Sequence, residues 1–409
     1  MYNIIKDQRP YFIIIAHYFI KVKEIERNKM KICAVICEYN PFHNGHLYQL
    51  NEAKRRSGAD AVLCIMSGNF VQRGEAAIID KFTRAKHAVV GGADAVIELP
   101  TIFATSNAEL FAKGAISILS AIPAVSTLCF GAETDDESAF LQTAQLLNNE
   151  PKEISQKIKE LTAEGMSYAK ARALAWKTLL PCDILTTPNN ILGVEYTRAI
   201  LSKKSKIDIL PIQRLGAGYK DNELSESFSS ASAIRTAIST NADVKNALPD
   251  FVKIDLPKHL SDNLDCLEKY AVLSRNSDEI AQVCDCTEGL ENAFKRAALL
   301  QAEFAESLTS ARYTASRIRR IALQNLLKID ETLIRDCLAS PLYLRVLAVK
   351  KSSTDILSAL SESPLTTIAR AHDENRLSKC AKRAFEIDRF AESVYNLLYK
   401  SSYSSTIFI

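Results

Sequence analysis

The chain has 409 residues, 47% of them hydrophobic, which exceeds the size at which one hydrophobic core stops growing, so two domains are expected. Its 51 basic and 48 acidic residues give a net charge of +3, which excludes a globally basic nucleic-acid-binding protein and restricts any basic surface to a local patch. Ten cysteines, several of them inside apolar runs, indicate reduced thiols that pack as small hydrophobes in a cytoplasmic protein.

The first 29 residues are expected to form an N-terminal extension outside the fold, disordered or the product of a start codon assigned too early. Their apolar stretch, residues 11–20, is too short to span a membrane. Charged residues follow it instead of a small-residue cleavage site, and Met30 directly precedes the first strand pattern. No membrane segment is therefore expected.

Short apolar runs alternate with helical patterns from Met30 onward. The expected strands are 31–38, 60–66, 94–98 and 126–130, and the expected helices are 46–56, 80–90 and 106–120. Short runs of Val, Ile, Leu and Cys separated by helices are typical of parallel strands joined by crossovers. The sequence predicts a doubly wound α/β domain, in which ligands bind at the carboxyl ends of the strands.

Beyond residue 134 helices become more frequent. Helices are expected at 135–148 and 151–163, at 167–179 and up to Lys203, and a strand at 207–212 is expected to complete the sheet. A glycine-punctuated loop, 213–219, and a serine-capped helix starting near Ser229 follow. Strand signals are scarce after 246. We therefore expect a catalytic domain at 30–245 and a mainly α-helical C-terminal domain at 246–409.

The most informative segment, Glu38-Tyr39-Asn40-Pro41-Phe42-His43-Asn44-Gly45-His46, lies where the first strand turns into the first helix. A helix start offers unpaired backbone N–H groups and the positive end of the helix dipole, so it favours phosphate. Gly45 allows a close approach of ligand to backbone, and His43 and His46 can face the same side of the first turn. The pattern indicates a nucleotide site, whereas in isolation it is equally compatible with a turn bearing two surface histidines.

Further candidates follow the other strands of the sheet. A loop after the second strand, with the helix behind it, is expected to supply a phosphate or acetate loop with a basic lining: Ser67, Gly68, Asn69, Arg73, Lys81 and Arg84. Gly131 ends a later strand where a side chain would obstruct a base or ribose. Arg214 and Arg235 carry planar guanidinium groups suited to phosphate or carboxylate, although a surface ion pair is the simpler interpretation of each.

The helical part contains one stretch rich in basic residues and free of acidic ones. It comprises Arg312, Tyr313, Arg317, Arg319, Arg320 and Lys328. Such a stretch is suited to RNA phosphates, with the tyrosine ring available to stack on a base. A solvated helix face with apolar residues behind it explains the pattern equally well.

Four segments together resemble the bacterial tRNA(Met) cytidine acetate ligase family, which belongs to the HxGH nucleotidyltransferase-like superfamily. They are Cys37 to His46, Met66 to Glu75, Gly92 to Pro100 and Pro188 to Tyr196. The resemblance covers most of residues 30–240, and Arg312-Tyr313 and Tyr343 to Leu347 are similar to family patterns in the helical part. The superfamily's serine-rich signature before Ile-Arg reads Ser230-Ala231-Ser232-Ala233-Ile234-Arg235, with alanine at one usual hydroxyl position.

The resemblance implies a two-step ligase that converts acetate and ATP into acetyl-adenylate, then transfers the acetyl group to the wobble cytidine of elongator tRNA(Met). It implies catalytic roles for His43, His46 and Arg214, with Ser232 and Arg235 near the phosphate or acetate. The implied ATP contacts are Val35, Ile36, Cys37, Glu38, Tyr39, Asn40, Pro41, Phe42, His43, Asn44, Gly45, His46, Leu47, Tyr48, Gln49, Gly131, Asn190, Arg214 and Leu215. Mg²⁺ is expected to be carried by the ATP phosphates, and no residue of the chain is assigned as a metal ligand.

Two other functions fit the same residues. One is a nucleotidyltransferase that acts on a small phosphate ester, which would need a nearly identical ATP site. The other is an RNA-binding factor whose nucleotide site is regulatory. The long helical half argues against the first, and retention of both histidines, Gly45 and Arg214 argues against the second. The sequence indicates no oligomeric state.

Overall fold

The computed structural model describes residues 30–149, 151–176, 184–215, 229–240, 242–257, 263–340, 342–399 and 406–409. The expected N-terminal extension, residues 1–29, lies outside the described residues. So do the glycine loop from Gly216 to Tyr219 and the end of the helix expected at 167–179.

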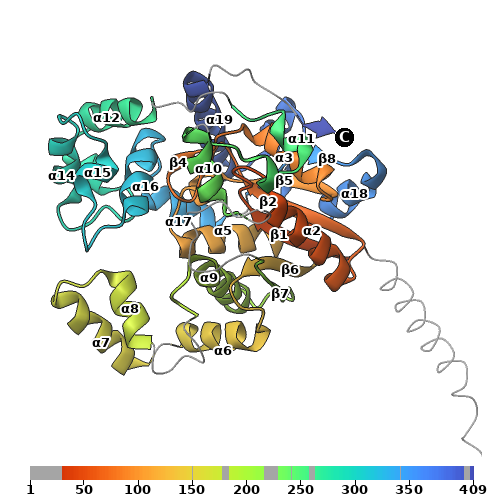
Figure 1. Ribbon diagram of the computed structural model, residues 1–409, viewed down its shortest axis with the longest axis horizontal. Coiled ribbons are helices and arrows are strands. Elements are labelled where there is room, and N and C mark those ends of the chain that lie inside the picture. Colours follow the sequence, from red (N-terminus) through yellow and green to blue (C-terminus); the bar gives the residue numbers. More distant parts are fainter. Residues whose placement is uncertain are drawn as a thin grey trace, which may run out of the picture.

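The elements follow the expected alternation of strands and helices (Figure 1). The strands are β1 (Ile32–Cys37), β2 (Ala61–Ser67), β3 (Phe70–Val71), β4 (Glu75–Ala76), β5 (Ala95–Leu99), β6 (Val125–Ala132), β7 (Asp208–Gln213), β8 (Tyr343–Val349), β9 (Thr366–Ile368) and β10 (Ile407–Phe408). The helices up to residue 239 are α2 (Asn44–Ser57), α3 (Lys81–Val90), α4 (Thr101–Ala104), α5 (Ala108–Leu119), α6 (Glu137–Asn148), α7 (Lys152–Ala163), α8 (Tyr168–Trp176), α9 (Pro188–Ser202) and α10 (Ala231–Ser239). The later helices are α11 (Asp250–Lys253), α12 (Leu264–Ser274), α13 (Ser277–Ala281), α14 (Leu290–Ala297), α15 (Phe304–Leu308), α16 (Ala315–Leu326), α17 (Glu331–Ala339), α18 (Asp355–Ser361) and α19 (Lys379–Tyr399).

The main sheet has the strand order β10-β8-β5-β2-β1-β6-β7, and β9 pairs with β8. From β5 to β7 neighbouring strands are parallel, which confirms the doubly wound α/β domain. The chain leaves β1 toward β2 and β5 on one side and later returns to β6 and β7 on the other. The strand order therefore reverses between β1 and β6, and in such sheets ligands bind outside the carboxyl ends of the strands at this switch point.

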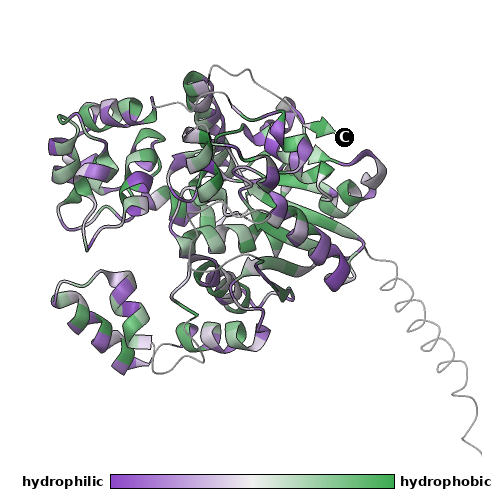
Figure 2. Ribbon diagram, viewed as in Figure 1, coloured by the Kyte–Doolittle hydropathy of each residue, from purple (hydrophilic) through white to green (hydrophobic). Residues whose placement is uncertain are grey.

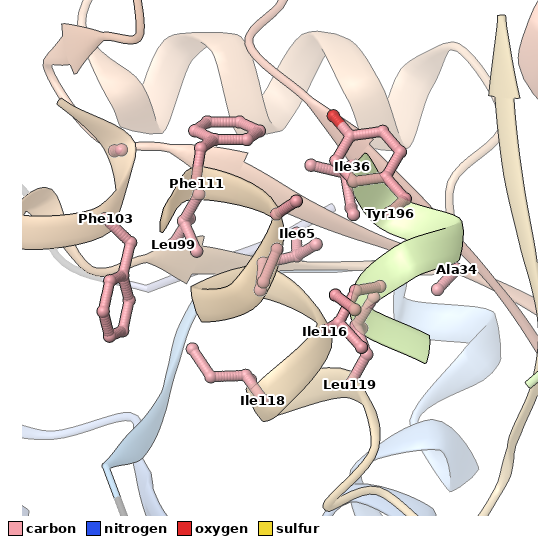
Figure 3. Packing of buried hydrophobic residues seen from close by; sticks show 14 of the residues in the cluster. Ala34, Ile36, Ile65, Leu99, Phe103, Phe111, Ile116, Ile118, Leu119 and Tyr196 are labelled. Carbon is pink, nitrogen blue, oxygen red and sulfur yellow. The ribbon is translucent and has the colours of Figure 1, made fainter. Parts of the chain in front are cut away.

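Apolar side chains alternate between the two faces of the sheet. On one face Ala34 and Ile36 of β1 pack with α5 and α9, where Phe111, Ile116 and Tyr196 contribute to the core (Figure 3). On the other face the intervening β1 residues pack with α2, α3 and α10. Figure 2 shows hydrophobic strands covered by helices with mixed surfaces. No helix in the described part of the chain is both long and apolar enough to cross a membrane.

The C-terminal segment is mainly helical, as expected, but it also contributes the strands β8, β9 and β10 to the catalytic sheet. β8 pairs antiparallel with β5, and β9 and β10 pair parallel with β8. The helices α12 to α16 form a lobe with a core of their own, which includes Val272, Phe294 and Ile321. After this lobe the chain returns to the sheet, so a division at residue 246 does not separate the sheet from the helices.

Four buried charges hold the returning segment in place. Lys81 of α3 lies 2.9 Å from Glu98 of β5 and 3.1 Å from Glu392 of α19, measured between Nζ and the nearest carboxylate oxygens. Arg345 of β8 bridges the same two carboxylates at 3.0 Å each. Burial alone would raise the pKa of Glu98, but Lys81 and Arg345 hold that pKa below its ordinary value. Two positive and two negative charges therefore compensate one another between the sheet and α19.

Replacing Lys81 with methionine should destabilise the protein by about 3–5 kcal/mol, because it leaves two buried carboxylates with a single cation. Urea unfolding followed by circular dichroism measures the loss. The matched control is Lys113→Met, which removes a half-exposed ion pair with Glu109 and should change stability by less than about 1 kcal/mol. Equal effects of the two substitutions would contradict a stabilising role for the buried network.

Candidate active site

The two histidines lie at the first turn of α2, at the carboxyl end of β1. His43 is the N-cap residue, and its Nδ1 accepts a hydrogen bond from the N–H of Gly45 over 3.1 Å. The N–H of His43 donates in turn to Nδ1 of His46 over 3.3 Å. The two rings stack with centroids 3.6 Å apart. The helix start thus fixes both imidazoles side by side, in the arrangement that the sequence predicts.

Gly45 is required by the position of the His43 ring. A Cβ atom added to Gly45 would lie 2.9 Å from Cε1 and 3.1 Å from Nδ1 of His43. Any other residue would push the ring away from the backbone N–H that it caps. The glycine therefore allows the histidine to act as a helix cap, in addition to leaving space for a ligand.

Both imidazoles are neutral. Burial, together with the positive charge of Arg214, lowers the pKa of His43 to about 3. Burial, His43 and Arg214 hold the pKa of His46 well below its ordinary value. Because each Nδ1 accepts from the backbone, the proton of each neutral ring is on Nε2. The pair therefore presents two Nε2–H donors, without positive charge of its own.

Arg214 is held beside the histidines at the other side of the switch point. Its backbone N–H donates to the carbonyl of Ala132 over 2.9 Å, which extends the pairing of β7 with β6. A Cβ atom on Gly131 would lie 3.6 Å from Cγ of Arg214 and 3.9 Å from Nε2 of Gln49. The structure thus gathers Gly131, Gln49 and Arg214 around the start of α2, while Leu215 is exposed.

Glu133, which the sequence analysis did not single out, organises the approach to Asn190. Its carboxylate accepts hydrogen bonds from the side chains of Thr187 and Asn189 and from the N–H of Asn190. The side-chain oxygen of Asn190 accepts from the N–H of Glu133 over 2.9 Å. An acidic residue after a strand, facing a helix that starts with proline, is the signal that could have identified it. Glu133 therefore locks the start of α9 against the end of β6.

Arg235 of α10 contacts the loop that leads into the histidines. Its Nη1 donates to the carbonyl of Asn40 over 3.0 Å, and its Nη2 lies 3.5 Å from the carboxylate of Glu75. Ser232 lies one turn earlier on the same helix and is half-buried. Arg73 is exposed and lies close enough to Glu38 to lower the pKa of that carboxyl, although burial dominates and raises it.

Lys81 and Arg84 do not reach the surface of this crevice, so they do not provide the expected basic lining. Arg84 is completely buried and donates to the main-chain carbonyls of Ile79, Glu38, Ser67 and Gly68. Lys81 is in the buried charge network. Lys81 and Arg84 nevertheless order the expected loop. Arg84 donates to the carbonyls of Ser67 and Gly68, and the N–H of Lys81 donates to the side chain of Asn69.

The basic stretch of the helical lobe is largely engaged within the protein. Arg317 donates to the carbonyl of Asp285, and Arg320 lies 3.8 Å from its carboxylate. Arg312 and Tyr313 both bind Glu288, and Lys328 is exposed beyond α16. Arg319 is half-exposed and forms a 3.0 Å ion pair with Glu75, which joins the lobe to β4.

A glycine allows this close contact between the lobe and the β3–β4 hairpin. Gly74 has a φ of +76°, and an added Cβ atom would lie 2.5 Å from the backbone nitrogen of Arg320. The lobe therefore packs directly against the backbone of the turn between β3 and β4.

The family model described as HIGH Nucleotidyl Transferase matches residues 30–407. The chain belongs to this family. It is 37% identical over 387 residues to the tRNA(Met) cytidine acetate ligase of Caldanaerobacter subterraneus subsp. tengcongensis, a match that covers 91% of this chain and 96% of the relative. The relative of the same name from Acetivibrio thermocellus is 36% identical with the same coverage.

Two solved structures of Thermotoga maritima TmcAL have the same fold. The apo form has a TM-score of 0.85 and 31% identity, and the form bound with alpha-thio ATP has a TM-score of 0.82 and 29% identity. Each match covers 93% of this chain and all of the other. The resemblance to a nucleotidyltransferase-like family and the α/β fold expected from the sequence are confirmed.

The neutral state and tautomer of the histidines can be measured directly. In ¹⁵N NMR spectra of the free protein, Nε2 of His43 and His46 should be protonated and Nδ1 unprotonated, with no titration of His43 above about pH 4. Because the pKa of His43 in the folded state lies below 6.5, the unfolded chain binds protons first, so stability should decrease as the pH falls from about 6.5 toward 3.

Arg214→Met should raise the pKa of both histidines in the same titration, because it removes a positive charge that faces them. His372, whose side chain is exposed, lies outside this site, so its signals should be the same in the wild-type protein and in the variant. Protonation of His43 near neutral pH would contradict the buried, neutral pair.

Proposed function

We propose that this chain is an ATP-dependent ligase that joins acetate to the exocyclic amine of the wobble cytidine of elongator tRNA(Met). The observation that carries the proposal is the pair of neutral Nε2–H donors beside Arg214 at the switch point of the sheet. The names of relatives that are aligned along nearly the whole chain support the choice of substrates. The α-thio ATP complex of the similar Thermotoga maritima protein supports ATP as the nucleotide.

In the first step an acetate oxygen attacks the α-phosphorus of ATP, and the bond to the pyrophosphate oxygen breaks. Little covalent chemistry is required of the protein, so catalysis consists of positioning and of stabilising charge on the phosphates. His43 and His46 would donate Nε2–H to phosphate oxygens at the start of α2. Arg214 would supply the positive charge that the neutral histidines lack.

Mg²⁺ would enter with the nucleotide and be bound mainly by phosphate oxygens. The described residues contain no group of three or more His, Cys, Asp or Glu side chains placed to hold a metal ion. The ligands of the ion would therefore come from ATP and water, and the protein would supply hydrogen-bond donors to the phosphates.

In the second step the amine of cytidine attacks the acetyl carbon, a C–N bond forms, and AMP leaves with the electrons of the broken C–O bond. One proton of the amine is released to solvent. The tRNA would lie against the helical lobe, where Arg312, Arg319 and Lys328 retain exposed guanidinium or ammonium groups. The free cysteines of the described residues suit a reducing compartment, and we place the reaction in the cytoplasm.

His43→Asn should slow the activation step while preserving the fold, because asparagine is a good N-cap but lacks the imidazole donor. Loss of one preorganised donor lowers the rate by about 10²–10³. Acetate-dependent exchange of radiolabelled pyrophosphate into ATP measures this step, and tRNA binding should be unchanged. His372→Asn, on an exposed side chain, is the matched control.

The same exchange assay distinguishes the competing functions. Exchange that requires a phosphate ester and ignores acetate would favour a nucleotidyltransferase, and an absence of exchange would favour a binding factor. Incubation with ATP, acetate and total tRNA, followed by nucleoside mass spectrometry, tests the product. An active ATP site without formation of acetylcytidine would refute the proposal.

Arg312→Ala combined with Lys328→Ala should weaken tRNA binding and leave pyrophosphate exchange unchanged. The salt slope, which is the slope of log K for tRNA binding against the logarithm of the salt concentration, should become less steep by about 1 per lost phosphate contact. These two positions are preferable to Arg317 and Arg320, whose contacts with Asp285 stabilise the lobe itself. Lys351→Ala, on an exposed residue beyond β8, is the control. An unchanged salt slope would place the tRNA elsewhere on the protein.

A further inference from the structure

A cavity of about 360 Å³ lies where the helical lobe meets the catalytic sheet. The β3–β4 hairpin and α10 form one wall, and α12, α15 and α16 form the other, with the end of α19 nearby. Its size falls within the range of sites that bind small molecules. Its lining includes Glu75, Arg235, Arg319, Asp265, Glu268, Glu303 and Phe304.

Glu268 is the unusual group in this cavity. Its side chain lines the cavity and is only 6% exposed, yet Oε1 accepts no hydrogen bond from any residue that the structure describes. Burial, together with the charges of Asp265 and Glu303, raises its pKa well above the ordinary value. Buried carboxyl oxygens are normally hydrogen-bonded, so an acceptor of this kind favours a ligand that supplies N–H donors.

Four of the other charged groups in the cavity have partners. Lys269 neutralises Asp265 at 2.6 Å, and Glu75 lies between Arg319 and Arg235. Guanidinium groups thus line the cavity from both sides, Arg235 from α10 and Arg319 from α16, and the carboxyl groups of Glu268 and Glu303 line it from α12 and from the start of α15. The lining of the cavity therefore combines hydrogen-bond donors and acceptors with the apolar ring of Phe304.

Cytosine matches this arrangement. Its exocyclic amine donates two hydrogen bonds, and its ring nitrogen and carbonyl oxygen accept them. A carboxylate that accepts from the cytosine amine is a common recognition pair, and bases that react are read along this edge after they leave the stack. Uracil presents a carbonyl oxygen in place of the amine and would face ionised Glu268 with a second acceptor. A protonated Glu268 could donate to that oxygen, so the preference for cytosine requires the ionised form.

Arg235 connects the cavity to the nucleotide crevice. It lines the cavity, and its guanidinium also binds the carbonyl of Asn40, three residues before His43. A base held in the cavity would therefore lie next to the residue that supports the expected ATP loop. This position suits an acceptor that must meet an activated acetyl group formed at the histidines.

We propose that this cavity binds the cytosine that becomes acetylated, and that Glu268 positions it by accepting a hydrogen bond from the exocyclic amine. This inference rests on the proposed function. The hydrogen bond would lie in the plane of the ring. The lone pair of the amine, perpendicular to that plane, would remain available for attack on the acetyl carbon.

The test uses Glu268→Leu and Glu268→Gln in the full-length protein. At pH 8 the wild-type protein should bind an anticodon stem–loop with cytidine at the target position about tenfold more tightly than one with uridine there. Glu268→Leu should remove this preference, and Glu268→Gln, which keeps an oxygen acceptor, should retain part of it. Single-turnover acetylation by Glu268→Leu should decrease at least tenfold, with acetate-dependent pyrophosphate exchange unchanged.

Thermal unfolding separates this role from a structural one. Removing an unpaired buried carboxyl should leave the melting temperature of Glu268→Leu unchanged or higher. A lower melting temperature with lost exchange, or a retained preference for cytidine, would overturn the inference. Glu306→Gln, on an exposed residue of α15, is the matched control. Absence of acetylcytidine with wild-type protein would refute the proposed function, whereas the stem–loop preference tests the cavity independently.

Discussion

The geometry of the candidate active site depends on the burial of one guanidinium group. Arg84 has no exposed surface and donates to the carbonyls of Glu38, Ser67 and Gly68, at the ends of β1 and β2. These strands stop pairing where the ligand loops begin, so their last carbonyls need other donors. A cation on α3 supplies them, and its charge-assisted hydrogen bonds offset the cost of burying the guanidinium group, which lowers the pKa of Arg84. These hydrogen bonds hold the ends of β1 and β2, and with them the turn that carries His43.

A second constraint is that the chain returns to the sheet after the helical lobe. β8 pairs with β5, and the buried charges of Lys81, Glu98, Arg345 and Glu392 join the sheet to α19. The lobe is therefore tied to the catalytic sheet on both sides in sequence, and it also contacts the hairpin through the Arg319–Glu75 ion pair. A loosely tethered RNA-binding domain would have no comparable attachment. The cavity between the lobe and the sheet exists because of this closure.

Local features of the site could be predicted from the sequence, and those that depend on distant partners could not. The strand, the glycine and the two histidines are adjacent in the chain, so the turn at His43 was predictable from strand and helix patterns. β8 was not, because a short apolar run after many helices gives no sign of a partner about 250 residues earlier. Lys81 and Arg84 resembled exposed cations on an amphipathic helix, and only the folded chain brings carboxylates and carbonyls to them.

The two steps of the proposed reaction require opposite charges from the protein, and these charges lie at different places in the structure. The activation step generates negative charge on phosphates, which requires donors and a permanent cation, and Arg214 beside two neutral histidines provides both. If the histidines were protonated, ATP would bind more tightly before the reaction as well, and uniform binding of this kind does not accelerate the chemical step. The acceptor is a neutral amine, for which cations are of little use. An unpaired carboxyl group such as Glu268 is the complementary partner, and its burial lowers stability in favour of binding. A protein selected for stability alone would have replaced it with an apolar residue.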